Sequence, residues 1–190
     1  MKSSRTFSLL LLFAAVYWSF DSLMPSYKPD KETTSSEFSV DRALEHVREL
    51  SKEPHAVGFP GHEDVKKYII SELKEMGLET LVQEGYTAGD WGNLSKASNI
   101  LARIEGSEKG KALLLLSHYD SSPHSSLGAS DAGSGVATIL EGVRAFLSEN
   151  RVPKNDIIIL ISDAEELGLN GADLFVNNHP WVKDVGLVLN

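Results

Sequence analysis

Apolar residues recur every three or four positions in three parts of the chain, which is the spacing of one face of an α-helix. These positions are Ala43, Leu44, Val47 and Leu50; Val65, Tyr68, Ile69, Leu73 and Met76; and Val136, Ile139, Leu140, Val143 and Phe146. Ser39 is placed to cap the first helix, and Gly77 is placed to end the second. A further helix is expected after Glu166.

Short apolar runs between polar turns predict the strands. The segments are 78–86 (LETLVQEGY), 98–106 (SNILARIEG), 112–120 (ALLLLSHYD), 156–164 (DIIILISDA) and 184–190 (DVGLVLN). The last three runs are almost continuously apolar, as in parallel strands buried on both faces. They alternate with helices, and this order predicts right-handed crossovers. The fold class is therefore α/β, with a mostly parallel central sheet and helices on both faces.

The N-terminus carries an apolar run from Phe7 to Phe20, preceded by Lys2 and Arg5. The run is short for a membrane-spanning helix, which needs about 20 residues. A signal anchor, a cleaved signal peptide and a buried helix all remain open. Bulky aromatic residues stand where a cleavage site would need small ones, which favours the anchor. The basic residues would stay in the cytoplasm, so the chain after Ser26 is expected on the other side of a membrane.

Three regions follow from these patterns. Residues 1–26 are expected to form the signal anchor or transmembrane segment, and residues 27–38 read as a polar linker rich in Ser and Thr. Residues 39–190 form the folded domain, because the helix and strand patterns begin there.

The composition excludes several kinds of site and partner. The 190 residues are 42% hydrophobic, which suits one domain with a core, and they include no cysteine. A disulfide framework, a cysteine zinc site and a thiol nucleophile are thus excluded. The net charge of −9 and the pI of about 5.1 argue against nucleic acid as a partner, which would require a basic face.

Ionisable residues cluster at the predicted strand ends. His118 and Asp120 end one buried strand, and Glu165 and Glu166 follow the next; Asp131 lies in the loop GASDAGSG between them. Ligands collect at the carboxyl ends of parallel strands, and four carboxylates there would repel one another without cations.

The residue types fit divalent metal ions. Zinc accepts imidazole nitrogen and carboxylate oxygen, and two zinc ions about 3.5–4 Å apart can share a carboxylate. Asp120 can accept the second ring N–H of His118 and fix its tautomer. Of the adjacent glutamates, one can face a metal while the other takes a proton from bound water.

Each residue taken alone has a simpler interpretation. His118 could be an ordinary polar residue at a strand end, Asp131 a helix cap, and the glutamate pair a solvated helix start. The glycine-rich loop is not a phosphate cradle, since it lacks both the P-loop ending and the G-x-G-x-x-G spacing. No role is assigned to the remaining histidines, which are His46, His55, His62, His124 and His179.

Three motifs in order, SHYDSSP, GASDAGSGVATILEG and SDAEELGLNGADLF, resemble the co-catalytic dizinc aminopeptidases, the family of aminopeptidase Y and bacterial leucyl aminopeptidases. The resemblance covers about residues 39–190 and implies a zinc-exopeptidase-like α/β/α sandwich. With its apolar N-terminus, the chain is most similar to the membrane-anchored branch, represented by endoplasmic reticulum metallopeptidase and vacuolar membrane protease.

The resemblance also implies roles. His118 would bind one zinc, Asp120 would orient it, Asp131 would bridge both zinc ions, Glu166 would bind the second, and Glu165 would be the general base. One departure is Ala132, where relatives often have an acidic residue. The family also needs another carboxylate, expected two residues past Asn190, and a further histidine downstream. The chain is therefore expected to be a fragment, truncated at its C-terminus and not the active unit.

The implied function is a zinc exopeptidase with two Zn2+ ions that removes N-terminal residues from peptide substrates. Carboxypeptidases, glutaminyl cyclases and receptors without metal share this fold, so a carboxypeptidase, a cyclase or a non-catalytic ectodomain stays an alternative. The sequence does not indicate an oligomeric state.

Overall fold

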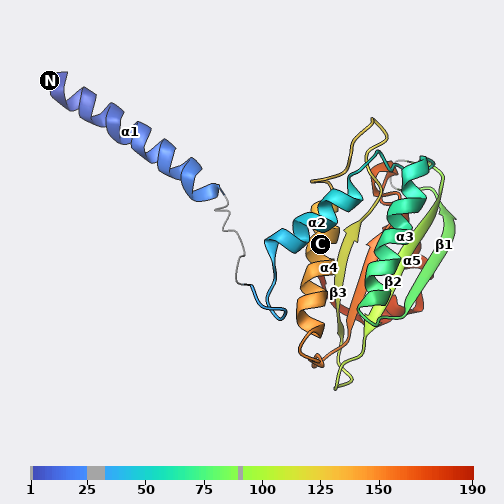
Figure 1. Ribbon diagram of the computed structural model, residues 1–190. Helices are drawn as coiled ribbons and strands as arrows, with labels where there is room; N and C mark the ends of the chain where they lie inside the picture. Colours follow the sequence, from blue (N-terminus) through green and yellow to red (C-terminus); the bar gives the residue numbers. More distant parts are fainter. Residues whose placement is uncertain (1, 25–32, 90–91) are drawn as a thin grey trace. The chain divides into compact units, whose positions relative to one another are not determined.

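The chain divides into two units, residues 1–30 and 31–190. A computed structural model describes residues 2–24, 33–89 and 92–190 (Figure 1). The first half of the predicted linker, residues 27–32, lies outside the described residues. The domain boundaries predicted at residues 26 and 38 stay predictions.

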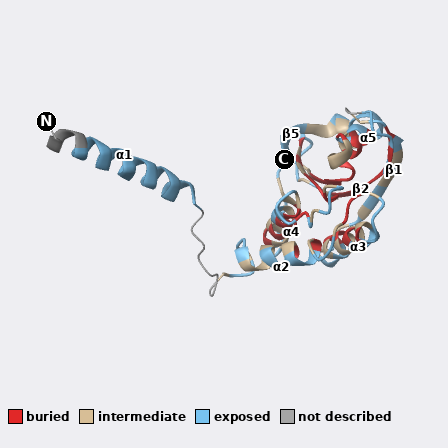
Figure 2. Cartoon of the chain, turned by 90° about the horizontal axis from the view of Figure 1, so that it is seen from above, coloured by how far each residue is buried: buried red, intermediate tan, exposed pale blue. Residues whose placement is uncertain are grey.

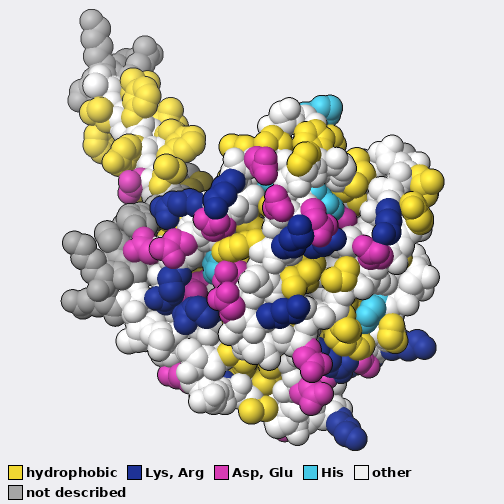
Figure 3. Space-filling model, turned by 45° about the vertical axis from the view of Figure 1, so that its right-hand side comes forward, with side chains coloured by type: hydrophobic (Ala, Val, Ile, Leu, Met, Phe, Trp, Pro, Cys, Tyr) yellow, Lys and Arg dark blue, Asp and Glu magenta, His cyan; other side chains and the backbone are white. Residues whose placement is uncertain are grey.

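The first unit contains one helix, α1 (Lys2–Leu23), which extends past the predicted apolar run at both ends. Its side chains from Phe7 onward are exposed and mostly hydrophobic (Figure 3). Within the described residues, one helical window, Thr6–Leu23, is long and apolar enough to cross a membrane, and none of it is buried. A signal sequence near an N-terminus meets the same criteria, so the helix fits both leading predictions.

The second unit has every helix and strand that the pattern predicts. The helices are α2 (Val40–Leu50), α3 (Pro60–Glu75), α4 (Gly133–Leu147) and α5 (Asn170–Asn178), with short 3-10 helices η1 (Glu165–Leu167) and η2 (Pro180–Asp184). The strands are β1 (Thr80–Thr87), β2 (Ser95–Ile104), β3 (Ala112–His118), β4 (Ile157–Ser162) and β5 (Val185–Leu189). Ser39 caps α2 by accepting from the Arg42 N–H, and Gly77 follows α3 with φ of 81°.

The five strands form one sheet in the order β1-β2-β4-β3-β5. Strand β3 is parallel to β4 and β5, whereas β2 is antiparallel to both β1 and β4. Only β2 therefore runs against the other described strands, and the predicted fold class is confirmed. His118 pairs with Ser162, so the carboxyl ends of β3 and β4 lie side by side.

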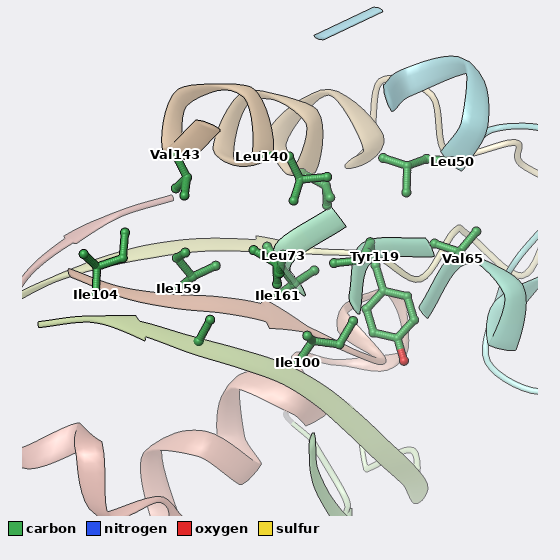
Figure 4. Close-up of a cluster of buried hydrophobic side chains, with 13 residues drawn as sticks. Leu50, Val65, Leu73, Ile100, Ile104, Tyr119, Leu140, Val143, Ile159 and Ile161 are labelled. Carbon is green, nitrogen blue, oxygen red and sulfur yellow. The ribbon is translucent and has the colours of Figure 1, made fainter. Parts of the chain in front are cut away.

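Helices cover both faces of the sheet, with α2, α3 and α4 on one side and α5 on the other (Figure 2). The alternation along β4 explains the two layers. Ile159 and Ile161 pack with the α3 and α4 side of the core, and Ile158 and Leu160 pack with Phe175 of α5. Figure 4 shows the first of these clusters, in which Tyr119 brings a hydroxyl group to the edge of the apolar layer. Packing on both faces of the sheet thus holds β3 and β4 in place, and with them the edge at which the two strands end.

Helix α2 is rotated relative to its predicted apolar stripe. Leu44 is 37% exposed, whereas His46, to which no role was assigned, is 8% exposed. The imidazole can be buried because its Nδ1 hydrogen-bonds with the Tyr68 hydroxyl of α3 at 2.6 Å. The inward face therefore contains His46 and Leu50, with Ala43 and Val47 half-buried beside them, and only the prediction for Leu44 was wrong.

Strand β5 was predicted to be buried, and that prediction was wrong for the described chain. Leu187, Val188 and Leu189 are 61%, 46% and 53% exposed. The reason is that β5 pairs with β3 along one edge, and no described strand covers its other edge.

A buried glutamate joins α2 to α4. The side chain of Glu141 is 0% exposed and accepts from Arg42 Nε at 3.0 Å, from Arg144 Nε at 2.5 Å and from the Ser39 N–H at 2.8 Å. Burial acts to raise the pKa of Glu141, but these hydrogen bonds outweigh it and lower the pKa below its ordinary value. A buried carboxylate is tolerated in this position because hydrogen-bond donors from three residues surround it.

We expect Glu141→Gln to lower the free energy of unfolding by about 3 kcal/mol at pH 7, the lower range for breaking a buried ion pair. The folded pKa lies below the unfolded one, so the contribution is present above the unfolded pKa and is lost as pH falls through the folded pKa. Urea unfolding at pH 7 and in acid measures both effects. The control is Glu149→Gln, which removes an exposed pair with Arg151 and should leave the midpoint unchanged. Equal midpoint shifts in the two variants would contradict the assignment.

Candidate active site

His118 ends β3 and is the centre of the candidate site. Its side chain is 10% exposed, and its Nδ1 lies 3.0 Å from the main-chain oxygen of Asp120. Its Nε2 lies 3.0 Å from Asp131 Oδ1 and 3.7 Å from Glu165 Oε2. The structure therefore brings together a histidine and two carboxylates that come from three separate segments.

Asp120 makes contacts that its spacing from His118 did not predict. Its side chain is 1% exposed, and its Oδ1 lies 3.4 Å from His118 Nδ1, farther than its own main-chain oxygen. The two carboxylate oxygens accept from the Glu165 N–H at 3.0 Å and from the Glu166 N–H at 3.1 Å. One buried carboxylate thus holds the backbone of the turn that carries both glutamates, in addition to lying beside His118.

Asp131 lies just before α4, where capping was the simpler alternative. The N-cap residue is instead Ala132, and no side chain makes a capping hydrogen bond there. The Asp131 side chain is 79% exposed, and it reaches His118 rather than the helix backbone. Its free carboxylate oxygen is therefore available to a ligand.

Glu165 and Glu166 lie in η1, directly after Ala164, which has a left-handed conformation with φ of 54°. The left-handed residue turns the chain sharply at the end of β4, so both side chains stay at the sheet edge. Burial raises the pKa of Glu166, and the negative charge of Asp131 raises it further.

The neighbouring carboxylates also raise the pKa of the histidine, although burial acts on it in the opposite direction. Burial lowers the pKa of His118, but the hydrogen bond with Asp120 and the charges of Asp120 and Glu165 outweigh it and raise the pKa to about 9. The surplus of negative charge therefore favours a cation at this position.

The donor set fits zinc in its chemistry. Imidazole and carboxylate are ordinary zinc ligands, and His118, Asp131 and Glu166 supply both kinds at one sheet edge. In the part of the chain that the structure describes, no three His, Asp or Glu side chains are arranged to hold one ion. His118 and Asp131 instead contact each other directly at 3.0 Å.

A second buried carboxylate, Asp163, borders the same turn, and the sequence analysis gave it no role. Its side chain is 0% exposed and accepts from His62 Nε2 at 2.7 Å. The only sequence signal was its position directly after the apolar run of β4. Gly171 packs against it so closely that a Cβ atom there would lie 2.3 Å from the Asp163 main-chain oxygen and from Asn99 Oδ1.

The family model and the similar curated proteins both point to a peptidase family. The model of Peptidase family M28 matches residues 99–190, which contain all five candidate site residues. The vacuolar membrane protease of Candida tropicalis is 31% identical over 205 residues, covering 100% of this chain and 22% of the relative. That of Candida albicans is 37% identical over 147 residues, covering 76% of this chain and 17% of the relative. The chain spans about a fifth of the length of the curated relatives it matches.

Two solved structures have a similar fold. Porphyromonas gingivalis glutaminyl cyclase aligns with a TM-score of 0.68 and 26% identity, covering 75% of this chain and 54% of that one. A Zn-dependent exopeptidase from Parabacteroides distasonis aligns with a TM-score of 0.65 and 26% identity, covering 77% and 58%. Similar folds therefore occur in a zinc peptidase and in a cyclase.

His118 and His55, which are both buried, should have pKa values shifted in opposite directions in the metal-free chain. His118 is expected to keep its proton up to about pH 9. Burial is the largest effect on His55 and lowers its pKa below 6.5, so this ring should lose its proton first. Imidazole 15N chemical shifts followed across pH 4–10 measure both values. If His118 released its proton before His55, the charge balance described for the site would be incorrect.

Proposed function

Because the chain belongs to peptidase family M28, we propose that it forms part of a zinc-dependent exopeptidase that removes N-terminal residues from peptides. The observation that carries this proposal is the fixed turn at the end of β4. Asp120 holds the backbone of Glu165 and Glu166 there, within reach of His118. The match to this family supports a metallopeptidase. The activity, the direction of attack on the substrate and the use of two ions are all part of the proposal.

Glu165 is proposed as the general base. Its carboxylate would take a proton from the attacking water and return it to the leaving amine, so the same group serves in both halves of the reaction. The side chain is 37% exposed, which leaves it open to water and substrate. Its backbone is held by Asp120, and the carboxylate is thereby kept in place while the proton moves.

His118, Asp131 and Glu166 are proposed as the zinc-binding residues, with Asp131 shared by two ions. Bound zinc would polarise the scissile carbonyl and stabilise the oxyanion. Asp131 suits the shared position because one of its carboxylate oxygens already contacts His118 Nε2 and its side chain is more exposed than that of Glu165. The Asp120 main-chain oxygen holds His118 Nδ1–H, which leaves Nε2 to face the metal.

A glutaminyl cyclase is the second candidate, because a structure with a TM-score of 0.68 has that activity in its name. Cyclisation of an N-terminal glutamine would use the same base and the same ligands. A non-catalytic ectodomain is disfavoured, since such a domain has no need to keep a base and ligands together.

We also propose that α1 anchors the protein in a membrane with residues 39–190 on the non-cytoplasmic side. The support is the exposed apolar helix and the membrane proteases to which the chain is similar. Lys2 and Arg5 stand at the start of α1, before its apolar run, and favour this orientation.

In the full-length protein, Glu165→Gln should lower kcat by about 10²–10⁴-fold, the usual contribution of a general base, while zinc content stays unchanged. Glu166→Gln should instead reduce zinc content. Leucyl and glutaminyl peptides distinguish the two activities, since an exopeptidase releases an amino acid and a cyclase releases ammonia. The matched control is Glu105→Gln, an exposed position on the opposite end of β2. Normal turnover in Glu165→Gln would show that the base lies elsewhere.

The anchor predicts that the mature protein fractionates with membranes and keeps residues 1–26. N-terminal sequencing decides this, because a start near Ser22 to Ser26 would indicate a cleaved signal. Protease added to sealed vesicles should leave residues 39–190 intact when that side faces the lumen. Digestion without detergent would show the opposite orientation.

A further inference from the structure

We propose that His62 and Asp163 form a positioning pair that fixes the turn carrying Glu165, and that this pair supports kcat rather than substrate binding. The inference rests on the proposed role of Glu165. It adds two residues that lie outside the proposed base and zinc ligands.

Asp163 is the centre of the pair. Its carboxylate is fully buried and accepts three hydrogen bonds, from the Ser98 N–H at 2.8 Å, the Ala164 N–H at 2.7 Å and His62 Nε2 at 2.7 Å. These donors come from β2, from the turn itself and from α3. Of these three hydrogen bonds, the one from His62 connects the turn to a helix on the α2–α4 side of the sheet.

The contact is placed to control the direction of Glu165. Ala164 links Asp163 to Glu165 and has a left-handed backbone, with φ of 54°. L residues adopt this conformation only when the surroundings enforce it. The Asp163 carboxylate holds the Ala164 N–H on one side of the bend, and Asp120 holds the Glu165 N–H on the other. The bend is therefore fixed between two buried carboxylates.

His62 is itself rigidly held. Its side chain is 13% exposed, and its ring stacks on Tyr119 with centroids 4.9 Å apart. The Tyr119 hydroxyl donates to the Ser98 main-chain oxygen at 3.1 Å, and the Ser98 N–H donates back to Asp163. His62, Tyr119, Ser98 and Asp163 thus form a closed ring of contacts, in which movement of His62 is transmitted to the turn.

The pair also has an electrostatic role. The Asp163 carboxylate is fully buried next to the turn, and a buried carboxylate charge without its donors would disturb the turn. The His62 donor stabilises that charge in place. Loss of the donor leaves Asp163 with backbone partners alone, so the turn can relax and Glu165 can move.

The substitutions His62→Asn and His62→Gln separate positioning from packing. The amide nitrogen of glutamine lies about where Nε2 does, so His62→Gln can still donate to Asp163. Asparagine is one methylene shorter and cannot reach. Both side chains are polar amides, and the difference between the two variants therefore reports the hydrogen bond.

In the full-length protein loaded with zinc, His62→Asn should lower kcat by about 10–100-fold, as expected for a displaced catalytic group, with KM within about twofold. His62→Gln should recover most of kcat. The control is His46→Gln, which removes the 2.6 Å contact with Tyr68 from a side chain of similar exposure, 10%. It should lower the thermal midpoint and leave kcat unchanged.

Amide hydrogen exchange in the same variants gives a reading that does not depend on activity. Exchange at Ala164, Glu165 and Glu166 should be faster in His62→Asn than in His62→Gln or His46→Gln. If the wild-type protein had no peptidase activity but exchange were still faster in His62→Asn, the result would support the pair as a support of the turn and contradict the proposed function. Unchanged exchange, or equal kcat in the two His62 variants, would overturn the pair even if Glu165→Gln abolished activity.

Discussion

A carboxylate can be buried only where enough donors surround it, and three such groups organise the folded unit. Glu141 joins α2 to α4, Asp120 joins the end of β3 to the η1 turn, and Asp163 joins that turn to α3 and β2. Each group accepts bonds from segments that are far apart in the sequence. The position of the candidate base is thus decided by buried charges outside η1, and the short helix that carries the glutamates does not hold itself in place.

The positions of the helices and strands could be predicted from the sequence because the apolar period is strong in each segment. The faces were harder to assign. Leu44 and His46 lie two positions apart, and hydropathy favours burial of the leucine. The helix is rotated the other way because Tyr68, 22 residues along the chain, supplies a partner for the imidazole. Burial of β5 failed for a related reason, since an apolar run says nothing about whether both of its edges and faces are covered.

The approach of His118, Asp131 and Glu165 also followed from the sequence, through the rule that parallel strands end at one edge. The second support of the turn did not. His62 and Asp163 are 101 residues apart, and their contact requires α3 to lie over the end of β4. It also requires β2 to run antiparallel beside β4, so that the Ser98 N–H meets the carboxylate. Neither arrangement is visible in the alternation of strands and helices.

The crowding around Gly171 restricts how this protein can vary over evolution. Any side chain there would displace the main chain of Asp163 or the amide of Asn99, and both lie within one hydrogen bond of the turn. Gly142 on α4 has open space around its Cβ position and carries no such restriction. Two glycines in one domain therefore differ in tolerance to missense change: a side chain at residue 142 has room, whereas one at residue 171 would have to move the backbone on which the turn depends.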